Sequence, residues 1–230
     1  MPKTKLWMGV GLAVLFIATA CHADSRKNLA KRITDANQYV NDIMEAPDTA
    51  IPQELLSKCR GVIILRQYRA GFIFGLKGGL GIALVRDEKT KTWSAPAFIK
   101  AGSGSYGFQI GGQSVDSIFV IMNRDGMEML MKTNFKIGVD ASAAAGPVGR
   151  DAEAKLGPGT AVLVYSRAKG LYAGASFEGG VLVSDDDANE SFYGRKGLSN
   201  KAILFEKQVK IPPEAKILIN TLEKYQASGT

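Results

Sequence analysis

Hydrophobic residues recur every three or four positions after Ser25, at Leu29, Ile33, Ala36, Val40 and Ile43. This spacing places them on one face of an α-helix, and a serine is a typical N-terminal cap. The other faces carry basic residues in the first half, Arg26, Lys27, Lys31 and Arg32, and acidic residues in the second, Asp35, Asp42 and Glu45. The pattern predicts an amphipathic helix whose apolar face either packs on its own domain or enters a membrane interface.

Two further stretches have the features of helices. Residues 51–56 are predicted to form a short helix with Pro52 in its first turn. A last helix is predicted to open at Pro212 and Pro213. Its apolar face comprises Leu218, Leu222 and Tyr225.

Between Gly61 and Ser184 the chain is rich in glycine and β-branched residues, and short apolar runs alternate with polar stretches. Turns are predicted at 86–92, 123–126 and 185–187. The acidic turn is followed by a loose stretch, and an apolar run at 202–205 then predicts one more strand. Strands are therefore expected to dominate the middle of the chain.

A four-residue unit, apolar-x-apolar-Gly, recurs within this region. The copies are Phe72-Ile73-Phe74-Gly75, Phe108-Gln109-Ile110-Gly111, Phe135-Lys136-Ile137-Gly138 and Leu171-Tyr172-Ala173-Gly174. Each is predicted to be a strand entered from a turn, because glycine or Asn134 precedes it. Strand glycines permit sharp bending and close backbone approach, to another strand or to a ligand. We predict an α+β fold: a curved antiparallel β-sheet, barrel-like or sandwich-like, flanked by helices near the N- and C-termini.

The first 23 residues have the features of a secretory signal peptide. Two lysines precede an uncharged run over 6–18, which is shorter than the ~20 residues of a membrane span. Cleavage is expected either after Ala23 or before Cys21, where the sequence is similar to a bacterial lipobox and Cys21 would be acylated. We expect an exported protein, in the periplasm or at the envelope membrane surface. The signal peptide covers 1–23, or 1–20 in the lipoprotein form, and one domain covers 24–230.

Composition narrows the functional classes. The 230 residues are 46% hydrophobic and 22% charged, with a mean hydropathy of -0.01, which is typical of a globular protein. They include one histidine, His22, and two cysteines, Cys21 and Cys59. Catalytic triads and zinc sites built from these residues are therefore not expected. We predict no cofactor, and a buried structural thiol at Cys59.

The net charge of the whole chain is +7. Removal of the signal peptide takes away Lys3 and Lys5 and leaves 27 basic against 22 acidic residues, a net charge of +5. Outside the cytoplasm this charge favours an anionic membrane surface over nucleic acid as the partner, although it can also serve solubility alone. Cations in predicted turns near tyrosines could meet phosphate headgroups. They are Arg167, Lys169, Arg195 and Lys196.

Several motifs match catalytic or ligand-binding patterns only in part. Residues 102–107 fit G-x-G-x-x-G, but a strand rather than a helix is predicted after them, so a dinucleotide site is not expected. Asp185 and Asp187 begin an EF-hand-like spacing that lacks the required glycine and bidentate glutamate. Paired acids such as Asp140 and Glu178 could serve a glycosidase, but acids in strand turns are usually caps or loop charges.

From about Ser25 to Tyr225 the chain resembles the SYLF domain family. The motifs that carry the resemblance include Ile51-Pro52-Gln53-Glu54-Leu55-Leu56, Trp93-Ser94-Ala95-Pro96, Gly104-Ser105-Tyr106-Gly107, Gly146-Pro147-Val148-Gly149-Arg150, Lys169-Gly170-Leu171-Tyr172-Ala173-Gly174 and Phe192-Tyr193-Gly194. The resemblance implies binding of membrane phospholipids, with a contribution from the amphipathic N-terminal helix, and it implies no catalysis. Some eukaryotic relatives bind actin filaments, but no actin partner is expected for an exported protein.

We therefore predict a non-enzymatic protein that binds anionic phospholipids at a bacterial envelope membrane. The expected lipid-binding residues are Arg26, Lys27, Lys31, Arg32, Arg167, Lys169, Arg195 and Lys196. The alternative is an envelope structural or interaction module that binds a protein or a polysaccharide, with the positive charge serving solubility.

Overall fold

The computed structural model describes residues 25–46, 48, 50–71, 74–106, 111–148, 157, 159–169 and 181–227. The helices of this part of the chain are α1 (Arg26–Met44), α2 (Gln53–Lys58), α3 (Arg124–Met129), α4 (Asp186–Tyr193), α5 (Asn200–Leu204) and α6 (Pro213–Ala227). The strands are β1 (Gly61–Gly71), β2 (Phe74–Val85), β3 (Ala97–Tyr106), β4 (Gly111–Ile121), β5 (Asn134–Lys136), β6 (Ala143–Ala145), β7 (Val162–Lys169) and β8 (Val181–Ser184). The predicted signal peptide, including Cys21, lies outside the described residues.

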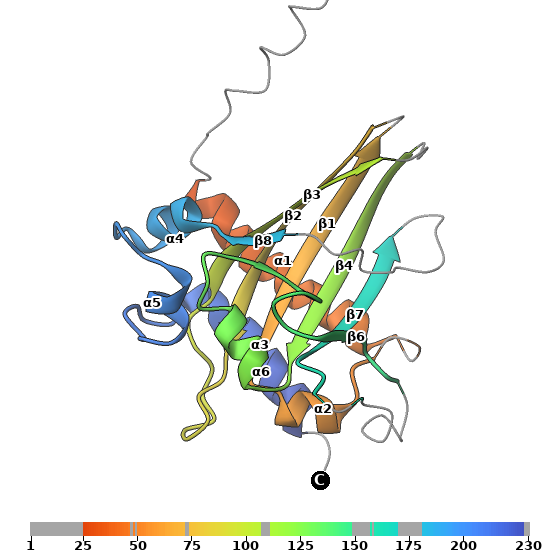
Figure 1. Cartoon of the computed structure of the whole chain (residues 1–230). Coiled ribbons are helices and arrows are strands. Elements are labelled where there is room, and N and C mark those ends of the chain that lie inside the picture. The colour runs from red at the N-terminus through yellow and green to blue at the C-terminus, as the bar shows by residue number, and fades with distance from the viewer. Residues whose placement is uncertain are drawn as a thin grey trace, which may run out of the picture.

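The described strands form one sheet in the order β5-β8-β3-β2-β1-β4-β7-β6. Neighbouring strands are antiparallel except β6 and β7, which are parallel. The long central strands curl the sheet into a half-barrel, with β5 and β6 at its edges (Figure 1). The predicted α+β class, with a curved sheet and helices near both ends, is confirmed.

Glycine in β2 allows two central strands to approach closely. A Cβ atom at Gly81 would lie 2.3 Å from the backbone oxygen of Ile64 on β1, so no side chain fits there. Gly78 of β2 is different: it pairs with Gly102 of β3, and a Cβ atom on either residue would meet nothing within 4 Å. Close backbone packing therefore accounts for Gly81 but not for Gly78 or Gly102.

One copy of the predicted repeat, at 135–138, lies wholly within the described residues. Phe135 and Lys136 belong to β5, and Ile137 forms an isolated bridge. Gly138 follows with a φ of +89°, a left-handed conformation that favours glycine. The predicted strand is confirmed here, but its glycine marks the exit of the strand rather than a bend inside it. The other copies include residues outside the described ranges.

Helix α1 lies across one face of the sheet (Figure 1). The Ser25 hydroxyl accepts a hydrogen bond from the backbone N–H of Asn28, which confirms the predicted cap. The predicted apolar face is buried against the sheet and the other helices, at Leu29, Ile33, Ala36, Val40 and Ile43. Of the two interpretations of this face, the structure therefore shows packing on its own domain.

Helix α6 runs parallel to α1, so both helices begin at the same end of the molecule. Arg26 of α1 pairs with Glu214 of α6 near their starts, and Tyr225 donates a hydrogen bond to Asn41 near their ends. The predicted apolar face of α6 is confirmed, since Leu218 and Leu222 are buried and Tyr225 is half-buried. No helix in the described ranges is long and apolar enough to cross a bilayer.

The opposite face of the sheet packs against α3, α5 and the segment around β5. This second core includes Phe119, Phe135, Leu182 and Ile203, all with at most 1% of their surface exposed. Because both faces are covered where β1 begins, its residues 62–65 form a continuous run of buried apolar side chains.

Three segments predicted as turns, loose chain or strand are short helices instead. The turn predicted at 123–126 lies within α3 and its cap, the acidic turn and the loose stretch after it contain α4, and the strand predicted at 202–205 overlaps α5. Each helix begins after a side chain that accepts a backbone N–H, from Asn123, Asp185 and Ser199 respectively. These caps favour helix in segments whose short apolar runs do not distinguish helix from strand.

Candidate functional site

Most of the predicted lipid-binding residues divide between two regions of the structure. The first region contains Arg26, Lys27, Arg195 and Lys196, and the second contains Lys31 and Arg32. Arg167 lies apart from both, on β7 beside the end of α1. Lys169 is the last residue of β7, and its side chain lies outside the described part.

The first region, which we name the N-terminal basic surface, combines the start of α1, the end of α4 and the chain from the connection before α6 into the beginning of α6. The Arg26 guanidinium pairs with Glu214 at 2.8 Å and lies 4.7 Å from the centre of the Phe192 ring. Arg195 donates hydrogen bonds to the backbone and side-chain oxygens of Gln208. These contacts bring together three segments that are distant in the sequence.

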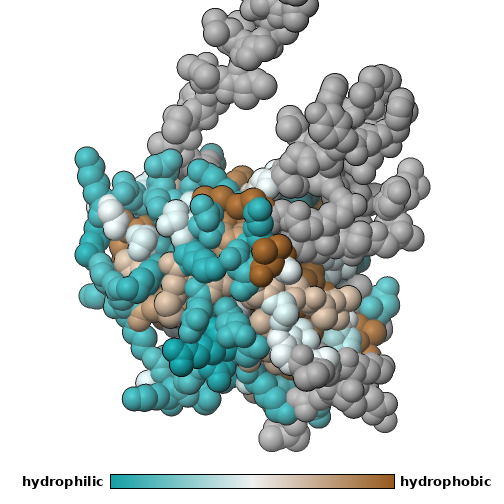
Figure 2. Space-filling model, in the orientation of Figure 1, coloured by the Kyte–Doolittle hydropathy of each residue, from teal (hydrophilic) through white to brown (hydrophobic). Residues whose placement is uncertain are grey.

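Exposed lysines and isoleucines complete the N-terminal basic surface. Lys27, Lys196, Lys210 and Lys216 are exposed, and no described carboxylate forms an ion pair with them. Ile211 is 41% exposed and Ile217 is 64% exposed. In the view of Figure 2, the part of the molecule formed by α4 and α5 is mostly hydrophilic. Isolated apolar side chains among cations suit contact with the headgroup region of a membrane.

The second region is a groove between α1 and strands β1 and β2, which we name the α1–sheet groove. Its cavity has a volume of about 220 Å³. The lining includes Lys31, Arg32, Tyr39, Arg66, Tyr68 and Leu80. Lys31 pairs with Asp35 one turn along α1, with 2.7 Å between nitrogen and oxygen.

Arg32 joins α1 to the sheet and to α4. Its guanidinium pairs with Asp185 at 3.1 Å, and only 11% of its side chain is exposed. Lys100 of β3 pairs with the other oxygen of Asp185 at 2.7 Å. The Arg32 guanidinium also lies 5.3 Å from the centre of the Phe98 ring. Two cations therefore share one buried carboxylate.

A second ion pair joins strands beneath α1. Arg66 of β1 donates two hydrogen bonds to the Asp116 carboxylate of β4, at 2.6 and 2.7 Å, and lies 4.1 Å from the centre of the Tyr39 ring. The hydrogen bond to Asp116 raises the pKa of Arg66, and burial raises the pKa of Tyr39. Both groups therefore keep their ordinary protonation states at neutral pH.

A row of mainly charged residues crosses the sheet beneath α1, and Arg66 and Leu80 of this row line the groove. The aligned residues, from β7 to β3, are Arg167, Asp116, Arg66, Leu80 and Lys100. Helix α1 crosses the strands along this row, and the backbone oxygen of Asp42 accepts a hydrogen bond from Arg167. The prediction that Arg167 and Lys169 lie in a turn is wrong, because β7 continues through both residues beside β4.

Sequence reasoning missed several residues of both regions. Arg66 and Asp116 meet only through the register of their strands, and Lys100 meets Asp185, which is distant in the sequence. The only sequence signal for each was a charged residue beside an apolar run. Ile211 and Ile217 lie just before and within α6, and their exposure depends on which face of α6 packs against α1.

Asp140, one of the acidic residues considered for catalysis, accepts hydrogen bonds from its own neighbourhood in the fold. Asp140 accepts hydrogen bonds from the Lys132 side chain and from the Lys136 N–H, which lower its pKa. Glu178 lies outside the described residues. Within the described part of the chain, no group of three or more His, Cys, Asp or Glu side chains could hold a metal ion.

Cys59 ends α2 as a buried free thiol, which confirms the prediction made for it. Burial raises its pKa from 9.0 to about 12, so the thiol stays protonated at neutral pH. Since the thiolate is the reactive form, this environment does not suit a nucleophile.

Comparison with known proteins gives a consistent set of similarities. A family model described as "Ysc84: Las17-binding protein actin regulator" matches residues 102–225. Protein YSC84 of Saccharomyces cerevisiae is 35% identical over 181 residues, which are 76% of this chain and 38% of that protein. SH3 domain-containing YSC84-like protein 1 of Mus musculus is 35% identical over 191 residues, 80% of this chain and 55% of that protein. The chain thus spans about 38% to 55% of these relatives. No solved structure matches.

Proposed function

The chain belongs to the Ysc84/SYLF family, and from this premise we propose that it is a non-enzymatic module that binds anionic phospholipid membranes. The N-terminal basic surface makes the contact. The protein is exported to a bacterial envelope, and it is lipid-anchored if Cys21 is acylated.

One observation carries this proposal: exposed cations and exposed isoleucines lie on the segments that meet the start of α1. Lys27 and Lys196 come from different segments and form no ion pair with a described carboxylate, so their charge is available to phosphate groups. Ile211 and Ile217 add apolar side chains beside them. Because the apolar face of α1 is buried in the core, membrane contact uses the N-terminal basic surface and does not involve insertion of that apolar face.

The position of α1 in the chain also supports the assignment. Cys21 precedes Ser25 by four residues, a span of at most about 14 Å. An anchor at Cys21 would therefore hold the start of α1, and with it the N-terminal basic surface, next to the membrane.

The test is co-sedimentation of the chain from Asp24 to Thr230 with vesicles, neutral against phosphatidylglycerol-containing, over a range of salt. We expect binding to the anionic vesicles that weakens as salt increases. The variant Lys27→Glu/Lys196→Glu should weaken binding at least about tenfold, because each cation near the surface contributes about 1 kcal/mol.

The matched control is Lys89→Glu/Lys136→Glu, which changes the net charge equally at exposed positions outside this surface. The control should bind nearly as well as the unchanged protein. Equal losses in both variants would show that only net charge matters, and the assigned surface would be wrong.

Binding of a protein is the second candidate, because the matching family model carries that description. If the unchanged chain binds neither kind of vesicle, this alternative replaces the lipid proposal.

A further inference from the structure

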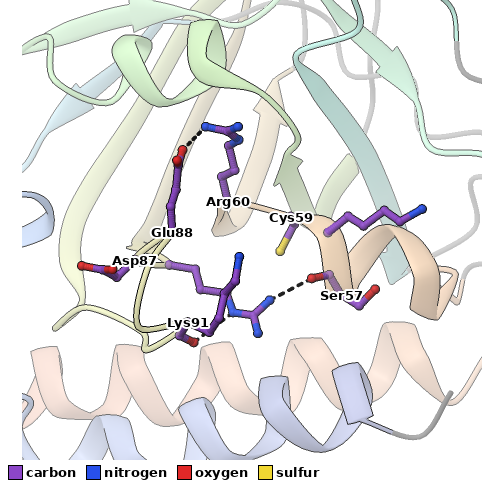
Figure 3. Close-up of a pocket in the computed structure, with 8 residues that line it drawn as sticks. Ser57, Cys59, Arg60, Asp87, Glu88 and Lys91 are labelled. Atoms are coloured by element: carbon purple, nitrogen blue, oxygen red, sulfur yellow. Dashed lines mark hydrogen bonds and ion pairs between the residues drawn. The ribbon is translucent and has the colours of Figure 1, made fainter. Parts of the chain in front are cut away.

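A groove lies at the end of the sheet where β1 begins and β2 ends. Two adjoining cavities of about 370 and 900 Å³ form it, and Arg60, Arg86, Asp87 and Glu88 line both of them. Figure 3 shows the smaller cavity, between the end of α2 and the connection from β2 to β3. We name the two cavities together the Arg86 groove. Their volumes are in the range of small-molecule sites.

One part of the lining of the larger cavity is apolar, among charged and polar residues. It comprises Val85, Met127, Met131, Leu204 and Phe205, from the end of β2, from α3 and its C-terminal turn, and from the end of α5. Met131 is 44% exposed although it lies beside these apolar residues. Methionine side chains adapt to ligands of different shape, so this lining suits a flexible hydrocarbon.

Basic residues outnumber acidic ones around the groove. The basic residues are Lys58, Arg60, Arg86, Lys91, Arg124, Lys132 and Lys207. The acidic residues are Asp87, Glu88 and Glu128, and each pairs with a cation of the groove. Lys132 pairs with Asp140, which lies outside the groove, and the basic excess that remains favours an anionic ligand.

Arg86 is the cation best placed to bind such a ligand. Its Nε donates to the backbone oxygen of Lys91 at 3.0 Å, and its Nη1 donates to the backbone oxygen of Ser57 at 2.8 Å. No carboxylate of the described residues pairs with it. The two carbonyls hold the guanidinium in place while its charge stays uncompensated, which is the preorganisation that an anion site requires.

The backbone at the rim of the groove is strained. Lys91 and Lys207 have φ values of +59° and +53°, and they are the only residues other than glycine with positive φ in the described ranges. Both line the groove. Such conformations cost energy and cluster at functional sites.

We propose that the Arg86 groove binds one molecule of a single-chain amphiphilic carboxylate, of the fatty-acid class. The carboxylate lies at Arg86, and the hydrocarbon chain lies against Met127, Met131 and Phe205. This site is separate from the N-terminal basic surface, and it takes a free monomer rather than a bilayer.

The test is isothermal titration calorimetry of the chain from Asp24 to Thr230 with octanoate, decanoate and dodecanoate, each below its micelle concentration. We expect one molecule bound per chain and an affinity that rises by up to about fourfold for each added methylene. Uncharged decyl maltoside should bind more weakly than decanoate. A missing signal for all three carboxylates, or an affinity independent of chain length, would overturn the proposal.

Two variants locate the site. Met131→Asp places a negative charge and removes an apolar contact at an exposed position, and it should weaken decanoate binding at least about tenfold. Val139→Asp makes the same kind of change at a residue that is 78% exposed and outside the groove, and it should leave binding unchanged. Equal effects in these variants would place the ligand elsewhere.

A third variant tests how the carboxylate is recognised. Arg86→Gln should remove the preference for decanoate over decyl maltoside, and a retained preference would contradict the role of Arg86.

Discussion

The basic residues in the first half of α1 belong to two regions that differ in how their charges are balanced. On the N-terminal basic surface, Lys27 is exposed and forms no ion pair with a described carboxylate. In the α1–sheet groove, Arg32 is mostly buried and shares Asp185 with Lys100. Lys27 and Arg32 lie on the same helix, so the difference comes from what each side of α1 faces.

This comparison separates cations that hold the fold from cations that are available to a partner. A buried pair leaves a costly unpaired charge when one member is removed. An exposed cation contributes little to stability, and its charge remains accessible to phosphate. Substitutions in the groove should therefore change stability, and those on the surface should change binding.

The largest loss is expected for Arg66→Gln, which leaves the buried Asp116 carboxylate without its bidentate partner. The free energy of unfolding, measured in urea, should fall by about 3–5 kcal/mol. The double variant Arg66→Met/Asp116→Leu removes both charges and should lose much less. A loss below about 1 kcal/mol for the single variant would contradict the structural role of the groove.

Gly81 also lines the groove and should be almost as sensitive. Gly81→Ala forces a Cβ atom against the backbone of β1 and should lower the free energy of unfolding by about 3 kcal/mol. Gly78→Ala has open space and should change it by no more than about 0.5 kcal/mol. Equal effects in the two alanine variants, by thermal or urea unfolding, would show that β2 can shift away from β1.

Within α1 itself, Arg32→Gln and Lys27→Gln form a matched pair. Arg32→Gln removes one of the two cations on Asp185 and should cost about 1.5 kcal/mol of stability. Lys27→Gln should cost no more than about 0.5 kcal/mol and should weaken vesicle binding instead. If Arg32→Gln weakened vesicle binding more than Lys27→Gln while the fold stayed intact, the assignment of the two regions would be reversed.

The smallest effect concerns the Arg26–Glu214 pair of the N-terminal basic surface. Its own backbone N–H and the Arg26 guanidinium lower the pKa of Glu214 below 4.5. The ionised Glu214 side chain therefore stabilises the fold above pH 4.5, and this contribution, at most about 1 kcal/mol, is lost as the pH falls through the lowered pKa. Thermal unfolding between pH 6 and 3 should be slightly less acid-sensitive in Glu214→Gln. An identical pH profile would show that the Glu214 charge contributes nothing to stability.

Local patterns predicted much of the fold. The apolar face of α1, its Ser25 cap and the face of α6 followed from helical spacing, and the glycine-rich middle predicted the curved sheet. The prediction of a strand at 202–205 was wrong, because Ile203 and Leu204 are buried in α5. A short run of buried residues has no periodicity that distinguishes a helix from a strand. Closure of the curved sheet into a barrel could not be predicted from local patterns, because closure depends on which edge strands pair with each other.

The sequence by itself determined the helices at both ends, the strand-rich middle, the positive charge and the family resemblance, because these depend on local spacing and on motifs. Only the tertiary structure decided which cations are available. Arg32 meets Asp185 across 153 positions, and Arg66 meets Asp116 across 50, through packing and strand register that no local pattern encodes. The same packing left Lys27 and Lys196 exposed. Burial and pairing, set by the fold as a whole, therefore separate charges that hold the fold from charges that are available to a partner.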